Sequence, residues 1–288
     1  MVDVVVDVVD RTPVGMMLRD WRRRRRRSQL DLALDAGVSA RHLSFVETGR
    51  SRPSRSMVLL LAEQLEVPLR DRNQLLLAAG FAPTFVQRPL GDPEMAPIRD
   101  ALEVVLKGYE PYPALVVDRL WNLVAANASV PLLLQGVDAD LLTPPMNVLR
   151  VSLHPRGAAG QIINLAQVRA YILDRLARDA AVTAAPELVE LHRELLAYPG
   201  GIERDGVDHG LAVPLRMRAG EHELAFISTV TTFGTAVDIT TAELSVEAFL
   251  PADAETAQLL PILAANLAAG MGQGSPATSS AIGLREPV

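Results

Sequence analysis

The stretch that decides the fold is residues 28–47, SQLDLALDAGVSARHLSFVE, which predicts two short helices joined by a glycine turn. Ser28 stands where a helix N-cap is expected, and an aspartate three residues later completes a capping-box pattern. Gly37 follows the first helix, where a left-handed residue ends a helix at least cost if it is glycine. Ser39 then caps the second helix, Ala40 to Glu47. Two helices joined in this way can place the second one in the major groove of DNA.

The sequence on both sides extends this pair to five helices. The helical spacing of apolar residues, together with serine and proline start signals, predicts helices over 14–26, 29–36, 40–47, the stretch after Ser54, and 69–79. Within the second helix we expect Leu30, Ala33 and Leu34 to face the core. The small side chain of Ala33 allows the second and third helices to approach each other.

Charge separates this segment from the rest of the chain. Residues 11–88 carry 15 arginines and 7 acidic residues, a net charge of +8, whereas residues 89–288 carry 13 basic and 24 acidic residues, a net charge of −11. Such a split indicates a polyanion-binding module joined to a domain with a different function. The competing interpretation is chance clustering of charges on solvated faces. Six arginines are consecutive, at 22–27, and helical rotation spreads them around the axis. We expect two or three of them near phosphates and the others in solvent.

The residues of this segment resemble the XRE family, the Cro and phage-repressor type of helix-turn-helix. The resemblance covers about 67 residues, 14–80, and is carried by Ser28-Gln29, Ala36-Gly37-Val38-Ser39, Glu47-Thr48-Gly49-Arg50 and Pro53-Ser54. It implies a domain, residues 14–82, that binds double-stranded DNA. The positions that it implies for DNA contact are Arg22, Gln29, Ser39, Ala40, Arg41, His42, Ser44, Phe45, Arg50, Arg52 and Arg55. The three arginines that follow the recognition helix are expected to set the register through phosphate contacts.

The resemblance implies different tasks within this set. Gln29 matches the glutamine that contacts a phosphate and braces the recognition helix. Arg41 has the best chemistry for reading a base, because a guanidinium pairs with O6 and N7 of guanine. His42 contacts either a base or a phosphate, and Phe45 either touches a thymine methyl group or packs against its own domain. Glu47 is expected to pair with an arginine inside the domain.

The second half of the chain predicts an α+β domain over residues 98–271, after a proline-rich linker at 83–97. Apolar and alternating runs predict strands at 113–118, 120–126, 211–218, 223–231 and 242–250. Helices are expected at 97–108, 127–134, 161–178, 185–197 and from about 252. Because the long helices stand between the second and third strands, we expect an antiparallel five-stranded sheet with helices on one face. Residues 1–13 are expected to form an N-terminal tail and 272–288 a disordered one.

This half resembles the ligand-binding domain of MmyB-like transcription regulators, which has a PAS-like fold. The resemblance is carried by EPYPALVVD at 110–118, WN at 121–122, SLHP at 152–155 and TTFGT at 231–235. It implies a small, largely apolar ligand, such as a fatty acid, held between the sheet and the helices. The ligand-binding candidates are Trp121, His154, Tyr171, Phe226 and Phe233, and for each of them ordinary core packing is the competing interpretation.

Other classes of protein find little support in the sequence. The chain has no cysteine, no apolar run of membrane-spanning length and no signal peptide. Its five histidines lack metal-ligand spacing, and the motifs of nucleophile elbows, dinucleotide sites and P-loops are absent. We therefore expect a cytoplasmic regulator without a cofactor, a metal site or an enzymatic activity, which binds a pseudo-palindromic operator as a homodimer and does not bind membranes. The alternative is a DNA-tethered module whose acidic domain binds another protein and no small molecule.

Overall fold

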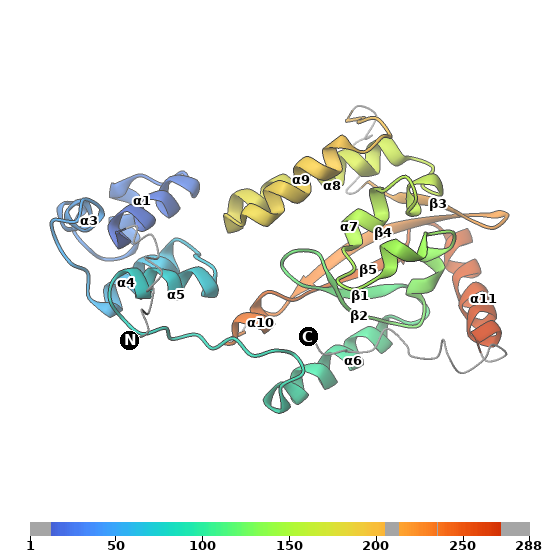
Figure 1. Cartoon of the computed structure of the whole chain (residues 1–288), viewed down its shortest axis with the longest axis horizontal. Coiled ribbons are helices and arrows are strands. Elements are labelled where there is room, and N and C mark those ends of the chain that lie inside the picture. Colours follow the sequence, from blue (N-terminus) through green and yellow to red (C-terminus); the bar gives the residue numbers. More distant parts are fainter. Residues whose placement is uncertain (1–12, 205–212, 235, 272–288) are drawn as a thin grey trace, which may run out of the picture. The chain divides into compact units, whose positions relative to one another are not determined.

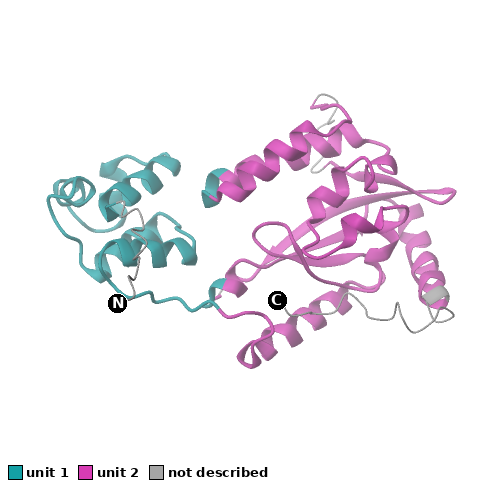
Figure 2. Cartoon of the chain, in the orientation of Figure 1, with its two compact units in different colours: residues 1–87, 181–184, 237–239 teal, residues 88–180, 185–236, 240–288 magenta. Residues whose placement is uncertain are grey.

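The computed structural model describes residues 13–204, 213–234 and 236–271 and divides the chain into two compact units (Figure 2). The helical unit consists chiefly of residues up to 87, and the sheet unit of most residues from 88 onward. The C-terminal tail expected at 272–288, and all but the last residue of the N-terminal one, lie outside the described residues. No helix within the described ranges is long and apolar enough to cross a membrane.

The helical unit contains the five predicted helices, which confirms this part of the expected fold (Figure 1). They are α1 (Val14–Arg24), α2 (Gln29–Asp35), α3 (Ala40–Glu47), α4 (Arg55–Gln64) and α5 (Leu69–Ala78). Three serines begin α2, α3 and α4, since the hydroxyl oxygens of Ser28, Ser39 and Ser54 accept the backbone N–H three residues on at 3.1, 3.1 and 3.2 Å. Gly37 has φ +63°, as its turn requires.

The orientation expected for α2 is wrong at two positions. Leu30 and Leu34 are 61% and 71% exposed, whereas Leu32 is buried together with Ala33 and Ala36. A helix of seven residues has only two turns, so its inward stripe is set by the helices around it and not by its own periodicity. The core of the unit is formed by fully buried leucines from all five helices, namely Leu18, Leu32, Leu43, Leu61, Leu65, Leu75 and Leu76.

The sheet unit is built on five antiparallel strands in the order β2-β1-β5-β4-β3, which confirms the expected α+β fold. The strands are β1 (Ala114–Val117), β2 (Leu123–Ala126), β3 (Leu215–Ala219), β4 (His222–Thr232) and β5 (Ser245–Pro251). The start of the predicted third strand, 211–212, lies outside the described residues. The helices are α6 (Ala96–Tyr109), α7 (Val148–Leu153), α8 (Leu165–Thr183), α9 (Pro186–Ala197), α10 (Ile239–Ala242) and α11 (Ala254–Met271).

Alternation along β1 divides the packing of the sheet between its two faces. Leu115 and Val117 lie in one cluster with leucines of α8 and α9, while Ala114 and Val116 lie in another with leucines of α6. The helices between β2 and β3 thus cover one face, as expected, and α6, which precedes the sheet, packs on the other (Figure 1). The helix expected at 127–134 is only a short 3₁₀ helix, Val130–Leu134. The short helix α7 was not predicted, and Asn147 caps it by accepting the N–H of Arg150 at 3.1 Å.

Candidate DNA interface and ligand cavity

Helix α3 presents one face to the core and one to solvent. Leu43 and Val46 are buried in the core of the helical unit, whereas Arg41 is exposed and Ser44 is half-buried. Phe45 is half-buried between two cations, because the guanidinium carbons of Arg41 and Arg50 lie 5.4 and 6.0 Å from the centre of its ring. The outer face of α3 therefore carries an arginine supported by an aromatic ring, which is suited to reading a base edge.

A glycine allows α1 to approach α3 closely. A Cβ atom added at Gly15 would lie 2.1 Å from the carbonyl oxygen of Val46. No side chain fits into such a contact, so the backbone of α1 packs directly on the last turn of α3. Gly15 lies inside a predicted helix, where no local pattern requires a glycine, so the sequence alone gives no sign of this contact.

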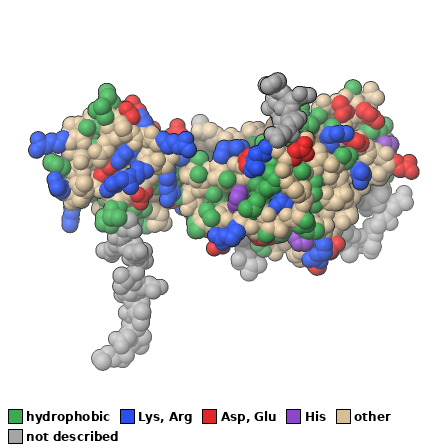
Figure 3. All heavy atoms as spheres, turned by 90° about the horizontal axis from the view of Figure 1, so that it is seen from above, with side chains coloured by type: hydrophobic (Ala, Val, Ile, Leu, Met, Phe, Trp, Pro, Cys, Tyr) green, Lys and Arg blue, Asp and Glu red, His purple; other side chains and the backbone are tan. Residues whose placement is uncertain are grey.

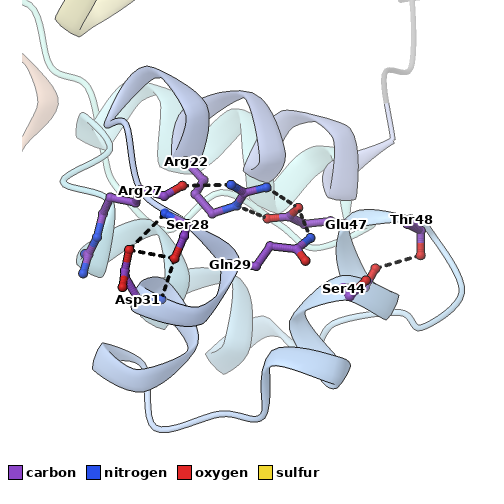
Figure 4. Close-up of polar contacts among 8 residues, drawn as sticks. All are labelled: Arg22, Arg27, Ser28, Gln29, Asp31, Ser44, Glu47 and Thr48. Carbon is purple, nitrogen blue, oxygen red and sulfur yellow. Dashed lines mark hydrogen bonds and ion pairs between the residues drawn. The ribbon is translucent and has the colours of Figure 1, made fainter.

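A buried ion pair joins the later part of α1 to the same last turn of α3 (Figure 4). The guanidinium of Arg22 donates from Nε to Oε1 of Glu47 at 2.7 Å and from Nη2 to Oε2 at 2.8 Å. Gln29 donates to the same Oε2 at 2.7 Å, and Nη1 of Arg22 donates to the carbonyl oxygen of Arg27 at 2.8 Å. The pairing expected of Glu47 with an arginine is thus confirmed. Arg22, which was predicted to contact DNA, lies in the interior, where it holds α1 against α3.

Electrostatics favour the charged form of this pair. Burial raises the pKa of Glu47, but the hydrogen bonds from Arg22 and Gln29 outweigh it and hold the pKa below its ordinary value. The hydrogen bond to Glu47 likewise raises the pKa of Arg22. The side chain of Glu47 is 1% exposed, so the carboxylate has exchanged water for a nearly complete set of protein donors.

The rest of the arginine run is divided between the α4 terminus and solvent. Arg25 donates to the carbonyl oxygens of Leu65 and Glu66 at 2.9 and 2.8 Å, and Arg27 donates to that of Gln64 at 3.0 Å. These carbonyls end α4, where a helix has unpaired acceptors and a negative dipole. The exposed members of the run are Arg23, Arg24 and Arg26. Half of the run therefore stabilises the unit, and at most the exposed half is free to meet phosphates.

The remaining predicted DNA contacts lie on or near the surface. Ser39 is exposed and Ala40 and His42 are half-buried, while Arg50, Arg52 and Arg55 are exposed. Arg55 donates to the hydroxyl of Thr84 at 2.7 Å. Figure 3 shows basic side chains spread over the visible face of the helical unit. The structure thus gives a half-buried helix flanked by exposed cations, an arrangement that fits a groove bordered by phosphates.

The sheet unit contains a cavity of about 120 Å³ on the face covered by α7 and α8. Its walls are mainly apolar and include Leu115, Leu149, Val151, Ile172 and Phe249. Two of the predicted ligand-binding residues, Trp121 and Tyr171, line it. An apolar cavity with few polar groups is the usual form of a small-molecule site.

The other three predicted residues lie elsewhere in the sheet unit. The ring of His154 meets that of Tyr198 edge-on at 5.1 Å, and its Nδ1 accepts the backbone N–H of Arg156 at 3.0 Å. Phe226 is fully buried in the cluster around Leu260 of α11, and Phe233 packs against the α6 cluster. For these three, the structure shows core or turn contacts, which was the competing interpretation.

One wall of the cavity carries charged groups that sequence reasoning missed. Nη1 of Arg175, on α8, lies 3.5 Å from Oε1 of Glu247, on β5, and Ser228 donates to the same oxygen at 2.5 Å. The guanidinium carbon of Arg175 is 4.3 Å from the centre of the Trp121 ring. Burial raises the pKa of Glu247, against the hydrogen bonds from Ser228 and Arg175. A carboxylate between Val246 and Ala248, inside a mainly apolar strand, is the signal that could have revealed this site.

Trp121 is held in a conformation that non-glycine residues rarely adopt. Its φ is +67°, in the left-handed region. Asp118 stabilises the turn, since its Oδ1 accepts the N–H groups of Leu120 and Asn122, both at 2.8 Å, and its carbonyl oxygen accepts that of Trp121 at 3.0 Å. The hydrogen bonds of this turn thus hold a strained residue in the wall of the cavity.

A metal site finds no support in the parts of the chain that the structure describes, because no three histidine, aspartate or glutamate side chains there gather as ligands.

Comparison with protein-family models gives two matches. Residues 98–263 match the MmyB-like transcription regulator ligand binding domain, and residues 18–71 match a helix-turn-helix model. The first match covers more than half of the chain and contains the whole cavity. A search of curated proteins gives no match.

Proposed function

The chain belongs to the family defined by the MmyB-like transcription regulator ligand binding domain, and from this premise we propose that a small, largely apolar ligand in its cavity controls where or how tightly α3 binds DNA. The coarser function, a DNA-binding transcription regulator with a ligand-binding domain, follows from the two family matches. The observation that carries the finer proposal is the apolar cavity with a charged group in one wall. In this proposal the protein acts by binding and not by catalysis.

In this proposal Arg41 reads a base and Arg52 holds the phosphate backbone. Arg41→Ala should reduce discrimination between the preferred site and sites changed at one base pair by about 1–3 kcal/mol. Arg52→Ala should weaken binding to all sequences alike and lower the salt dependence. The experiment selects bound sites from random DNA and then measures both variants on specific and random duplexes. Arg193→Ala, which removes an exposed charge from α9, is the matched control. An equal loss for Arg41→Ala on both kinds of duplex would refute its role in base reading.

The ligand part of the proposal has its own test. The purified protein is denatured and its extract analysed for a co-purified small molecule, and a metabolite and lipid panel is screened by thermal shift. A bound or stabilising apolar compound supports the sensor. An empty extract with no shift would favour the protein-interaction module, whose acidic domain recruits a partner protein to DNA.

We also propose that the regulator binds as a homodimer. Phage-repressor-type domains read two half-sites about one helical turn apart, and the operator symmetry then mirrors the symmetry of the protein. Sedimentation of the full chain with and without a selected duplex tests this, and a 1:1 complex on a site without internal symmetry would contradict it.

A further inference from the structure

The polar wall of the cavity is unusual because it carries both charges of an ion pair. The side chains of Arg175 and Glu247 are only 18% and 11% exposed, and they line a cavity whose other walls are mainly apolar. Removing two charges from water is costly, and a buried pair recovers the cost only when its geometry is very good. Packing alone therefore gives no reason for a pair at this place.

The pair is incompletely satisfied on the cavity side. Within the described residues, the two polar contacts of the Glu247 carboxyl, from Arg175 and Ser228, both use Oε1. The contact with Arg175 is monodentate at 3.5 Å, at the edge of direct hydrogen bonding. The guanidinium lies over the ring of Trp121, and it retains donors for a further acceptor. The wall thus offers donors beside an acceptor.

The net charge of this wall decides which headgroup it accepts. When Glu247 is ionised, it repels an anionic headgroup and already neutralises the charge of Arg175 that would attract it. A cationic headgroup meets the reverse arrangement. An uncharged group with an acceptor next to a donor satisfies both residues and leaves no charge unpaired. The volume of about 120 Å³ sets the size of the buried body, since an apolar cavity of roughly 150 Å³ in another protein holds benzene.

We propose that the cavity binds a compact, apolar, uncharged molecule that carries adjacent hydrogen-bond acceptor and donor groups, such as a primary amide, with Arg175 donating to the acceptor and Glu247 accepting from the donor. This inference rests on the proposed sensing function and narrows its ligand class. The ionised carboxylate of a fatty acid, which the family resemblance suggested, is disfavoured at this wall.

The test uses isosteric probes that differ in charge. Benzamide, benzoate and benzylammonium, and the amide, carboxylate and ammonium with a seven-carbon chain, are titrated into the full-length protein at pH 8 by calorimetry. The wild-type protein should bind each amide at least about tenfold more tightly than its charged analogues. This comparison needs no variant. Equal or tighter binding of a carboxylate by the wild-type protein would overturn the proposal.

Variants then test whether the two residues set this preference. Glu247→Gln removes the carboxylate that contacts Arg175 at the cavity, so the order should reverse and benzoate should gain about tenfold or more over benzamide. Arg175→Met should instead favour benzylammonium. Glu190→Gln, an exposed change on α9, should leave the order unchanged.

The outcomes separate the inference from the function on which it rests. Binding without charge preference, or a folded Glu247→Gln variant with the wild-type order, overturns the headgroup assignment and leaves the sensor standing. If none of the six probes binds and no co-purified molecule is found, the sensing function fails, and the inference fails with it.

Discussion

Each unit of the molecule contains a buried arginine–glutamate pair, and the two pairs are built in opposite ways. Arg22 contacts both oxygens of Glu47 at 2.7 and 2.8 Å, and Gln29 adds a third donor. Arg175 contacts one oxygen of Glu247 at 3.5 Å, beside a cavity. The first pair has the close, two-point geometry of an ion pair that holds two helices together. The second has spare hydrogen-bonding capacity in a place that a small molecule can reach.

The pKa values of the two glutamates differ in the way that these geometries predict. Hydrogen bonds overcome burial at Glu47 and lower its pKa, whereas burial prevails at Glu247 and raises its pKa. The presence of a buried ion pair therefore does not distinguish structural from binding roles. The number and geometry of the donors around the carboxylate do.

The largest expected effect comes from removing the arginine of each pair. Arg22→Met leaves Glu47 buried without its main donor and should lower the free energy of unfolding of the helical unit by about 3–5 kcal/mol. Arg175→Met should cost the sheet unit about 2 kcal/mol or less, because the methionine still packs on Trp121 and Glu247 can take up a proton. Native-state hydrogen exchange on the full chain, followed in peptides of α1 to α3 and of β4 to β5, measures both. Equal losses of stability in the two units would show that the two ion pairs do not differ in their structural role.

Lowering the pH should change the stability contributions of Glu47 and Glu247 in opposite directions. The pKa of Glu47 lies below its reference of 4.5 in the folded state, so its contribution to stability is present above that value and is lost as the pH falls through the folded pKa. The pKa of Glu247 lies above 4.5 when folded, so its contribution is present below 4.5 and is lost as the pH rises through the folded pKa. Both contributions are smaller than the loss of a whole side chain.

Two amide variants measure these contributions. The stability difference between wild type and Glu47→Gln should shrink as the pH falls below 4.5, and the difference between wild type and Glu247→Gln should shift in favour of the variant as the pH rises above 4.5. Hydrogen exchange or the Tm of each unit between pH 3 and 8 is the readout, with Glu190→Gln as the control. Parallel pH profiles for the two variants would show that the pairs are alike.

Local signals explain why so much of the helical unit could be predicted. Ser28, Ser39 and Ser54 each accept a hydrogen bond from a backbone N–H three residues away, and Gly37 adopts the positive φ of its own turn. Both partners of each interaction therefore lie within a short stretch of sequence. The same locality explains the error in α2, because its inward face depends on helices that its seven residues do not encode. The Glu47 pairing was anticipated through the family resemblance and not from spacing.

The charged wall of the cavity depends on contacts that no local pattern contains. Arg175 and Glu247 are 72 positions apart and meet only because β5 lies in the sheet beneath α8. Aromatic residues were only a partial guide to the cavity, since Trp121 and Tyr171 line it whereas Phe226 and Phe233 fill other clusters. A charge inside an apolar strand or helix was the better signal, because burial of a charge requires a specific reason.

The smallest effect extends the comparison to single arginines of the 22–27 run. Arg25 donates to two carbonyl oxygens at the end of α4, at 2.9 and 2.8 Å, whereas Arg23 is exposed. Arg25→Ala should lower the stability of the helical unit by about 1 kcal/mol, and Arg23→Ala should change it by less than about 0.5 kcal/mol. In a Trp121→Phe background Trp21 is the one remaining tryptophan of the chain, so its emission during urea unfolding reports on the helical unit. If Arg23→Ala costs as much as Arg25→Ala, the run stabilises the unit through its general charge and not through contacts with α4. If the two differ as expected, the rule drawn from the buried pairs holds on the surface too, where an arginine contributes through the acceptors that it reaches.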